Sequence, residues 1–155
     1  MKTLGLDPGL SGAIAVLDVE NHRVLVSDTP VLEINGKRFV DMNALADWVA
    51  QFDDIGMAYV EHVHAMPKNG VVSMFNFGMA FGAGCMAVAA AGHPWRLVKP
   101  NIWKKALSLP QGKDAARLVA TQLMPWAQAQ WSRKMDHNRA EAALLAYLAY
   151  KENSK

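Results

Sequence analysis

Two short apolar runs open the chain, and a turn separates them. Both runs consist mainly of Leu, Ile, Val and Ala, which predicts two short buried β-strands. Their main apolar positions are Leu4, Leu6, Ile14, Val16 and Leu17. Pro8, Gly9 and Gly12 lie between the runs and force the turn, so that Asp7 ends the first strand.

The same patterns predict three more strands and a series of helices. The expected strands are 23–29, 56–61 and 94–98. Asn35-Gly36, within residues 34–40, is a hairpin turn signal, and Asp41 is placed to cap the helix that follows. The expected helices are 42–52, 71–91, 100–104, 113–123 and 137–150.

Three meandering strands followed by alternating helices and strands indicate an α/β fold with a mixed sheet flanked by helices. The 155 residues contain no repeat, low-complexity tract or linker, so we expect one domain, 1–155. No phosphate loop of the G-x-x-x-x-G-K-[ST] type, no G-x-G-x-x-G motif and no zinc-like Cys/His spacing is present.

Composition favours a globular protein of a reducing compartment. Hydrophobic residues make up 52% of the chain, and the longest apolar stretch, Met79 to Ala91, is interrupted by glycines and is expected to be too short to span a bilayer. The single Cys85 allows no intrachain disulfide, and no leader signature precedes the first strand. We therefore expect a cytoplasmic location without membrane contact.

The net charge of +2 hides a strong asymmetry between the two halves of the chain. Residues 1–61 carry a net charge of −6, whereas residues 62–155 carry +8. The basic residues of the second half include Lys68, Arg96, Lys99, Lys104, Lys105, Lys113, Arg117, Arg133, Lys134 and Arg139. This skew is typical of a polyanion-binding face such as one for nucleic acid, and equally of a solvated basic surface.

Acidic residues stand where strands end. Asp7 and Glu61 each follow an apolar strand, and a carboxylate in that position is desolvated unless a cation, a basic side chain or backbone donors meet it. If the two strands are neighbours in the sheet, both carboxylates emerge at one edge. For Asp7 alone, the simpler interpretation is a cap of the turn before Pro8.

A third acidic group lies at the start of the last helix. Glu141 is surrounded by apolar residues, with His137 four residues and Asn138 three residues before it on the same face. Asp136 projects to one side, and a helix N-cap is an even alternative for it. For Glu141 the alternative is an ion pair with Arg139 or another basic group.

Two strand-end acids with one or two helix acids are suited to a site for two Mg²⁺ ions. Mg²⁺ prefers oxygen ligands and keeps waters that a phosphate can replace. Two such ions activate the attacking water and stabilise the leaving oxygen in phosphodiester cleavage, so that no protein nucleophile is needed.

Five segments together resemble one family. They are G-L-D-P-G-L-S-G-A-I-A-V at 5–16, Y-V-E-H-V-H-A-M-P at 59–67, W-K-K-A-L at 103–107, G-K-D-A-A-R at 112–117 and D-H-N-R-A-E-A at 136–142. In this order they resemble the RuvC-type Holliday junction resolvases, especially the divergent phage and bacterial group, within the ribonuclease H-like superfamily. The resemblance implies a five-stranded mixed sheet and a homodimer that nicks opposed strands of branched DNA with Mg²⁺ or Mn²⁺ in the bacterial or phage-infected cytoplasm.

The resemblance also implies roles for individual residues. It assigns Asp7, Glu61 and Glu141 as metal ligands. Many relatives have a further acid three or four residues before the last one, where this chain has Asn138 and His137. We expect Asp136 to be the fourth ligand, with His137, which can bind metal or act as a base, as the alternative.

Candidate DNA contacts follow from the resemblance and from charge. Aromatic side chains of the family reach the junction centre from the segment after Glu61, which makes Phe75 and Phe77 candidates, with core packing as the simpler alternative. Trp103 is expected to pack in the core. The small-residue helix 78–91 resembles the dimer interface. The expected phosphate contacts are Lys68, Lys104, Lys105, Lys113, Lys134 and Arg139.

The leading hypothesis is thus a metal-dependent endonuclease that acts on branched DNA. A junction-binding architectural protein without cleavage is the main alternative, because Asn138 stands where an acid is common. A sugar-kinase or actin-like ATPase opens with a similar turn, but the chain has no room for the second lobe that such proteins need.

Overall fold

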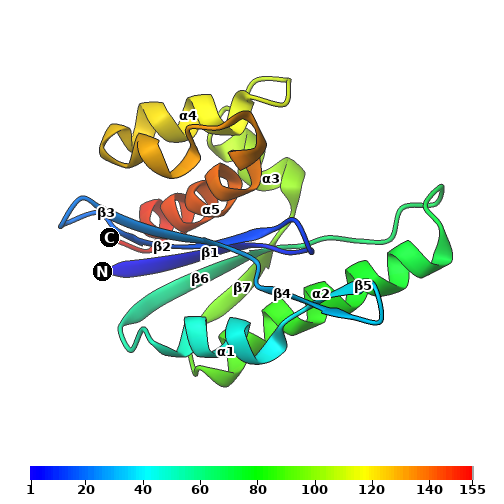
Figure 1. Ribbon diagram of the computed structural model, residues 1–155. Coiled ribbons are helices and arrows are strands. Elements are labelled where there is room, and N and C mark those ends of the chain that lie inside the picture. Colours follow the sequence, from blue (N-terminus) through cyan, green and yellow to red (C-terminus); the bar gives the residue numbers. More distant parts are fainter. Residues whose placement is uncertain (155) are drawn as a thin grey trace.

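The computed structural model describes residues 1–154, which form a five-stranded mixed sheet flanked by helices (Figure 1). The strand order is β3-β2-β1-β6-β7, in which β1, β2 and β3 are antiparallel, whereas β6 and β7 run parallel to β1. The bounds are β1 (Lys2–Asp7), β2 (Ala13–Asp18), β3 (Arg23–Asp28), β6 (Ile55–Glu61) and β7 (Trp95–Val98). The predicted fold class is confirmed.

Helices cover both faces of the sheet. One face carries α5 (His137–Asn153) with α4 (Ala115–Leu123) and α3 (Pro100–Ala106), and the other carries α1 (Met42–Ala50) and α2 (Val71–Ala90). Successive residues of β2 point to opposite faces, so Ala13, Ala15 and Leu17 pack under α5 while Ile14 and Val16 pack toward α1 and α2. Burial on both faces explains why these strands are almost continuously apolar.

The central strand and α5 are in unusually close contact. A Cβ atom added to Gly5 would lie 2.0 Å from the carbonyl oxygen of Ala142 and 2.5 Å from the backbone nitrogen of Ala146. The neighbouring Thr3 hydroxyl donates a hydrogen bond of 2.7 Å to the Ala146 carbonyl oxygen. The alanine-rich face of α5 and the glycine of β1 therefore bring the start of α5 near the end of β1.

A separate two-stranded hairpin follows β3. It consists of β4 (Val31–Ile34) and β5 (Lys37–Val40), which pair with each other and with no other strand of the described residues. The predicted Asn-Gly turn is confirmed, because Asn35 and Gly36 have φ values of 52° and 75°, as a tight hairpin requires. Asp41 caps α1, as expected, by accepting a hydrogen bond of 3.0 Å from the Ala44 N–H.

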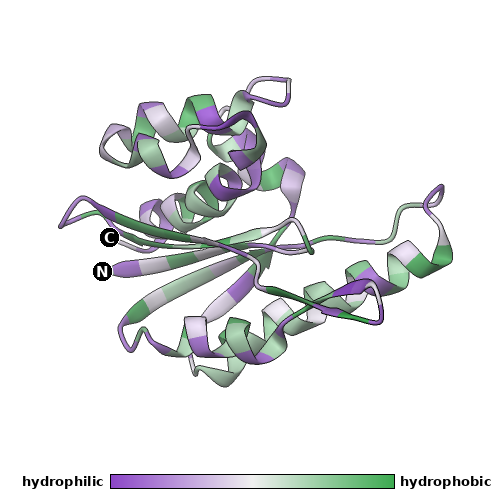
Figure 2. Cartoon of the chain, viewed as in Figure 1, coloured by the Kyte–Doolittle hydropathy of each residue, from purple (hydrophilic) through white to green (hydrophobic). Residues whose placement is uncertain are grey.

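The apolar segment around Met79 to Ala91 belongs to α2 (Val71–Ala90), whose bounds nearly match the expected helix 71–91. Helix α2 has 20 residues, and an 18-residue window of it has a mean hydropathy of 1.6, so by length and composition alone the whole helix is able to cross a membrane, although the apolar stretch 79–91 by itself is too short to do so. The reason is that the helix begins at Val71, which adds the apolar residues of its first two turns (Figure 2). One side of α2 packs against α1, β5 and β6.

The long segment between α4 and α5 is also more ordered than its sequence suggested. It forms two 3₁₀ helices, η1 (Pro125–Trp131) and η2 (Lys134–Asp136), where no element was predicted. Buried Trp131 anchors η1 by donating a hydrogen bond of 3.0 Å to the Thr121 hydroxyl.

Candidate metal centre and nucleic-acid interface

Asp7 and Glu61 end two neighbouring strands. Because β1 and β6 are parallel, with Leu6 opposite Val60, both carboxylates emerge at the same edge of the sheet. Both side chains are buried. The indole N–H of Trp103, from α3, donates a hydrogen bond of 2.8 Å to Oε1 of Glu61, which fixes this carboxylate and leaves its second oxygen free of that bond.

Glu141 approaches the same edge from α5. Its Oε1 lies 3.1 Å from Nζ of Lys104, and the Lys104 ammonium lies 5.1 Å from the centre of the Trp103 ring. The predicted alternative for Glu141, an ion pair with a basic group, is therefore present, with Lys104 in place of Arg139. Adjacent residues of α3 thus hold two of the three acids.

The three acids interact electrostatically. Burial raises the pKa of Asp7 well above its usual range, and the nearby charges of Glu61 and Glu141 raise it further, while Lys104 lowers it. Burial likewise raises the pKa of Glu61, the hydrogen bond from Trp103 lowers it, and Glu141 raises it. Like charges gathered in a partly desolvated position favour binding of a proton or a cation.

An open hollow of about 430 Å³ lies over this edge of the sheet. The turn after β1 forms one wall, α2 contributes a second, and the start of α5 contributes Asn138 and Glu141. The hollow is lined by Asp7, Pro8, Gly9, Leu10, Ser11, Gly12, Ser73, Asn76, Phe77, Asn138 and Glu141. Asp7 and Glu141, which are far apart in the sequence, thus share one cavity, whereas Glu61 is not among its lining residues.

Asp136 does not lie with these acids. Its carboxylate accepts a hydrogen bond of 2.9 Å from the Arg133 backbone N–H and one of 2.7 Å from the Arg133 guanidinium, while Arg139 lies 3.9 Å away. The Arg133 guanidinium holds the pKa of Asp136 below its ordinary value. The structure brings Asn138, in place of Asp136, to the cavity, where its side-chain amide donates to the Ser11 carbonyl oxygen.

Replacing Asp136 with Asn is expected to lower stability and to leave any nicking activity intact. Loss of the charged contacts to Arg133 costs about 1–3 kcal/mol, or roughly 2–10 °C in Tm for a chain of this length. Because the folded pKa is lowered, this stabilisation is present above the unfolded pKa near 3.8 and is lost as the pH falls through the folded value. Thermal unfolding at pH 7 and pH 3 measures the difference. Abolished nicking with an unchanged Tm would instead make Asp136 a ligand.

The donor set fits a hard divalent cation. The polar side chains that line the first hollow are carboxylates, amides and hydroxyls, all with oxygen atoms of the kind that Mg²⁺ and Mn²⁺ bind. Within residues 1–154, no three His, Cys, Asp or Glu side chains are already close enough to enclose an ion. The Lys104–Glu141 ion pair accounts for part of this, since it directs Glu141 toward a basic group.

The predicted phosphate contacts lie in three different settings. Lys104 and Lys113 border a second hollow of about 540 Å³, which shares Glu141 with the first and includes His137. Arg139 is engaged instead, because its guanidinium makes two hydrogen bonds of 2.7 Å with the Asp28 carboxylate. Three of the predicted contacts are simply exposed: Lys68, Lys105 and Lys134.

The two aromatic candidates, Phe75 and Phe77, differ in their burial. Phe75 is 67% exposed near the start of α2, so the core-packing alternative does not hold for it. Phe77 is partly buried, lines the first hollow and lies against Gly9, where an added Cβ would be 3.3 Å from its ring. Trp103 packs in the core as expected, but its hydrogen bond to Glu61 was not predicted.

The sheet order and the helices on both faces define a ribonuclease H-like fold. Within that class, the chain is similar to RuvC of Thermus thermophilus. RuvC in complex with a Holliday junction substrate matches with a TM-score of 0.68 and 22% identity over 100% of this chain and 97% of that chain. A second RuvC structure of the same organism matches with a TM-score of 0.64 and 19% identity over 99% of this chain and 97% of that one. No protein-family model and no curated protein sequence matches the chain. The chain thus has a RuvC-like fold.

Proposed function

We propose that the protein is a metal-dependent endonuclease that resolves four-way or related branched DNA junctions by paired nicks. The observation that carries the proposal is the gathering of Asp7, Glu61 and Glu141 at one edge of a RuvC-like sheet, where burial and mutual repulsion raise the pKa of Asp7. The similar RuvC structure contains a Holliday junction, which makes branched DNA the substrate to test first.

Each residue of the site has its own role in such a reaction. Asp7, Glu61 and Glu141 would hold Mg²⁺ or Mn²⁺, which supplies an activated water and neutralises charge on the phosphate. Trp103 orients Glu61 through its indole N–H. Lys104 neutralises Glu141 when no cation is bound, and Lys113 on the wall of the adjoining hollow is placed to hold a phosphate. The role of Asp136 as a fourth ligand has no support from its position beside Arg133.

The decisive experiment incubates the protein with a labelled four-way junction, a replication fork, a flap and linear duplex in the presence of Mg²⁺ or Mn²⁺. Symmetric nicks in the four-way junction that require the metal support the proposal. Retarded but intact junction with both metals contradicts it.

A junction-binding protein without cleavage is the second candidate, and one observation favours it. Asn138 lies at the cavity with its amide on the Ser11 carbonyl, so this position offers no fourth carboxylate beside Asp7, Glu61 and Glu141. Replacing Asn138 with Asp separates the candidates, because it adds the acid that many relatives carry there. If the wild-type protein does not nick the junction and the Asn138→Asp variant does, the wild-type protein is a junction-binding protein without cleavage.

We also propose that the protein acts as a homodimer through α2. Only 22% of an 18-residue window of the apolar helix is buried within one chain, and exposed residues recur along one side of the helix. Cβ atoms added to Gly78 and Gly82 would meet nothing within 4 Å, so these positions leave room for close approach of a second helix. The exposed residues of this side are Val71, Phe75, Gly78, Gly82, Met86 and Ala89.

Replacing Gly82 with Lys is expected to convert the dimer to a monomer without unfolding the chain. The new side chain has free space in one protomer but would place a charge in the apolar interface. Sedimentation or light scattering measures the mass, and thermal unfolding checks the fold. A second variant, Ala90→Lys, adds the same charge to the exposed last residue of α2, outside this stripe. An unchanged mass for Gly82→Lys would place the interface elsewhere.

A further inference from the structure

A third hollow of about 510 Å³ adjoins the carboxylate site on the side of the β4–β5 hairpin. It shares Leu10, Ser11, Gly12 and Asn138 with the first hollow, so the two meet at the turn after β1. The second hollow meets it at His137. The three hollows thus surround the first turn of α5, with the acids between the hairpin side and the Lys113 side.

The hairpin supplies one wall of the third hollow. Arg38 of β5 lines it, and both Arg38 and Lys37 are exposed. They are two of only four basic residues among residues 1–61, a segment with net charge −6. No ion pair of residues 1–154 involves Arg38, although Glu33 faces it across the hairpin. Its guanidinium is therefore available to an external anion.

The turn and the base of the β4–β5 hairpin hold Arg38 in a defined position. The tight turn at Asn35 and Gly36 fixes the register that pairs Glu33 with Arg38. Val40, at the base of β5, is buried in the core with Leu45 and Val49 of α1, and β5 contacts α2. Figure 1 shows the hairpin extending beside α2, away from the five-stranded sheet.

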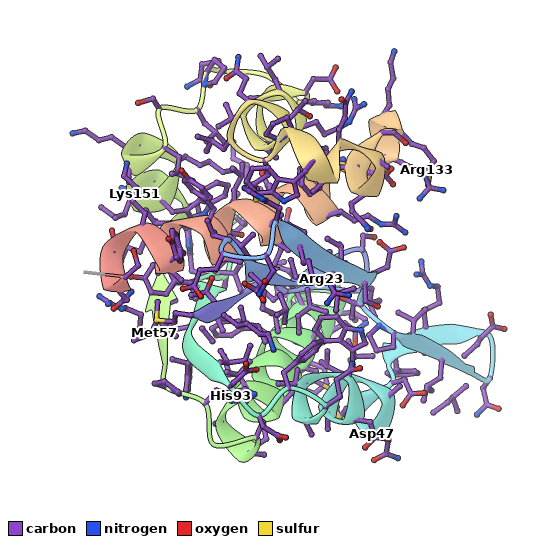
Figure 3. The ribbon with its side chains drawn as sticks, turned by 90° about the vertical axis from the view of Figure 1, so that its left-hand side faces the viewer. Arg23, Asp47, Met57, His93, Arg133 and Lys151 are labelled. Carbon is purple, nitrogen blue, oxygen red and sulfur yellow. The ribbon has the colours of Figure 1, made fainter. Side chains whose placement is uncertain are left out.

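A second arginine of this hollow comes from the segment just before η2. Arg133 lines the hollow, and its Nε and Nη2 bond Asp136, while the side chain as a whole stays 57% exposed. The two carboxylates of this hollow are already neutralised, Asp136 by Arg133 and Asp28 by Arg139. In Figure 3, Arg133 and the hairpin project on the same side of the molecule. The hollow is thus bordered by guanidinium groups with its acids paired.

We propose that this hollow is a phosphate-binding groove for the DNA strand that passes the carboxylate site, with the β4–β5 hairpin as a DNA-contacting arm and Arg38 as its main contact. The inference rests on the proposed function, since it names the surface through which the same substrate is held. A strand bound along the three hollows would meet Lys113 on one side of the acids and Arg38 on the other. Guanidinium groups suit phosphate because they donate two parallel hydrogen bonds.

Binding of a labelled four-way junction, measured in EDTA so that no strand is cut, tests the groove. Arg38→Ala is expected to weaken the affinity about five- to tenfold at moderate salt and to reduce the slope of log K against log salt by about one. Arg38→Lys, which keeps the charge, is expected to recover most of the loss. The matched control is Arg23→Ala, which removes the same charge from an exposed residue of β3 at the end of the sheet opposite Asp7.

The outcomes separate this inference from the proposed function. An Arg38→Ala protein that binds as wild type does, or no worse than Arg23→Ala, overturns the groove even if wild type cuts junctions. A selective loss for Arg38→Ala supports the groove even if wild type proves unable to cut, in which case only the nuclease proposal fails.

Discussion

Asp7→Asn is expected to reduce metal-dependent nicking by at least about 10³-fold while leaving junction binding within a factor of about two. The amide keeps the shape of the side chain but removes the charge that a divalent cation needs, and the lost transition-state stabilisation is several kcal/mol, with each 1.4 kcal/mol worth tenfold. The phosphate contacts proposed at Lys113 and Arg38 lie in neighbouring hollows and are unchanged. Single-turnover nicking and a binding titration on the same junction measure the two effects.

The same change is expected to stabilise the metal-free protein. Burial and the charges of Glu61 and Glu141 raise the pKa of Asp7, so the folded state binds more protons than the unfolded state between the unfolded pKa near 3.8 and the raised folded value. The free energy of unfolding therefore decreases as the pH rises through this window. Above the window the whole destabilisation by ionised Asp7, called the deficit below, is present. Asp7→Asn removes the deficit, so its Tm advantage over wild type should grow from acid toward neutral pH, by about 1–2 kcal/mol or roughly 2–8 °C.

Added Mg²⁺ provides an independent measurement. Binding to the folded state alone raises Tm with concentration, by the equivalent of about 2.7 kcal/mol at one hundred times the dissociation constant. Wild type should show this rise and Asp7→Asn should not. The control is Asp47→Asn, a loss of the same charge on the exposed face of α1. If wild type and Asp7→Asn respond equally to Mg²⁺ and cut equally, the acids at this sheet edge do not form the metal site.

The placement of Asp7 and Glu61 was predictable because strand ends are local features. An apolar run that ends in an acid specifies where the carboxylate emerges, and parallel neighbours bring their ends to one edge. Whether the two strands are neighbours was left as a condition, and the sheet meets it by placing β6 beside β1.

The contacts of Glu141 and Asp136 were harder to predict from the sequence, because they depend on how segments outside the local strand or helix fold against them. Asp136 lies five positions before Glu141 in the sequence, which left open whether a frayed helix start would turn Asp136 inward. The 3₁₀ turn at η2 resolves this by folding Asp136 back onto Arg133, whose backbone N–H and guanidinium both donate to the carboxylate. Trp103 and Lys104 were noted for packing and DNA contact, but their bonds to Glu61 and Glu141 depend on how α3 docks.

Gly5→Ala is expected to destabilise the fold by about 3 kcal/mol or more, which is roughly 6–12 °C in Tm. The added methyl group would lie 2.0 Å and 2.5 Å from backbone atoms of α5, and a backbone cannot rotate away as a flexible side chain can. The helix must therefore shift outward from β1. Thermal unfolding of the variant measures the cost, with Gly70→Ala as control, since that glycine has φ −60° and free space around it.

The shift of α5 also tests how the fold builds the site. Glu141 and Asn138 are carried on the first turns of α5, whereas Asp7 ends the same strand that contains Gly5. Moving the helix away from the strand separates Glu141 from Asp7, which weakens the repulsion that raises the pKa of Asp7 and should reduce the Tm gain from Mg²⁺. A destabilised Gly5→Ala protein that keeps the full Mg²⁺ response would show that Glu141 is not required for the ion, and that Asp7 and Glu61 suffice.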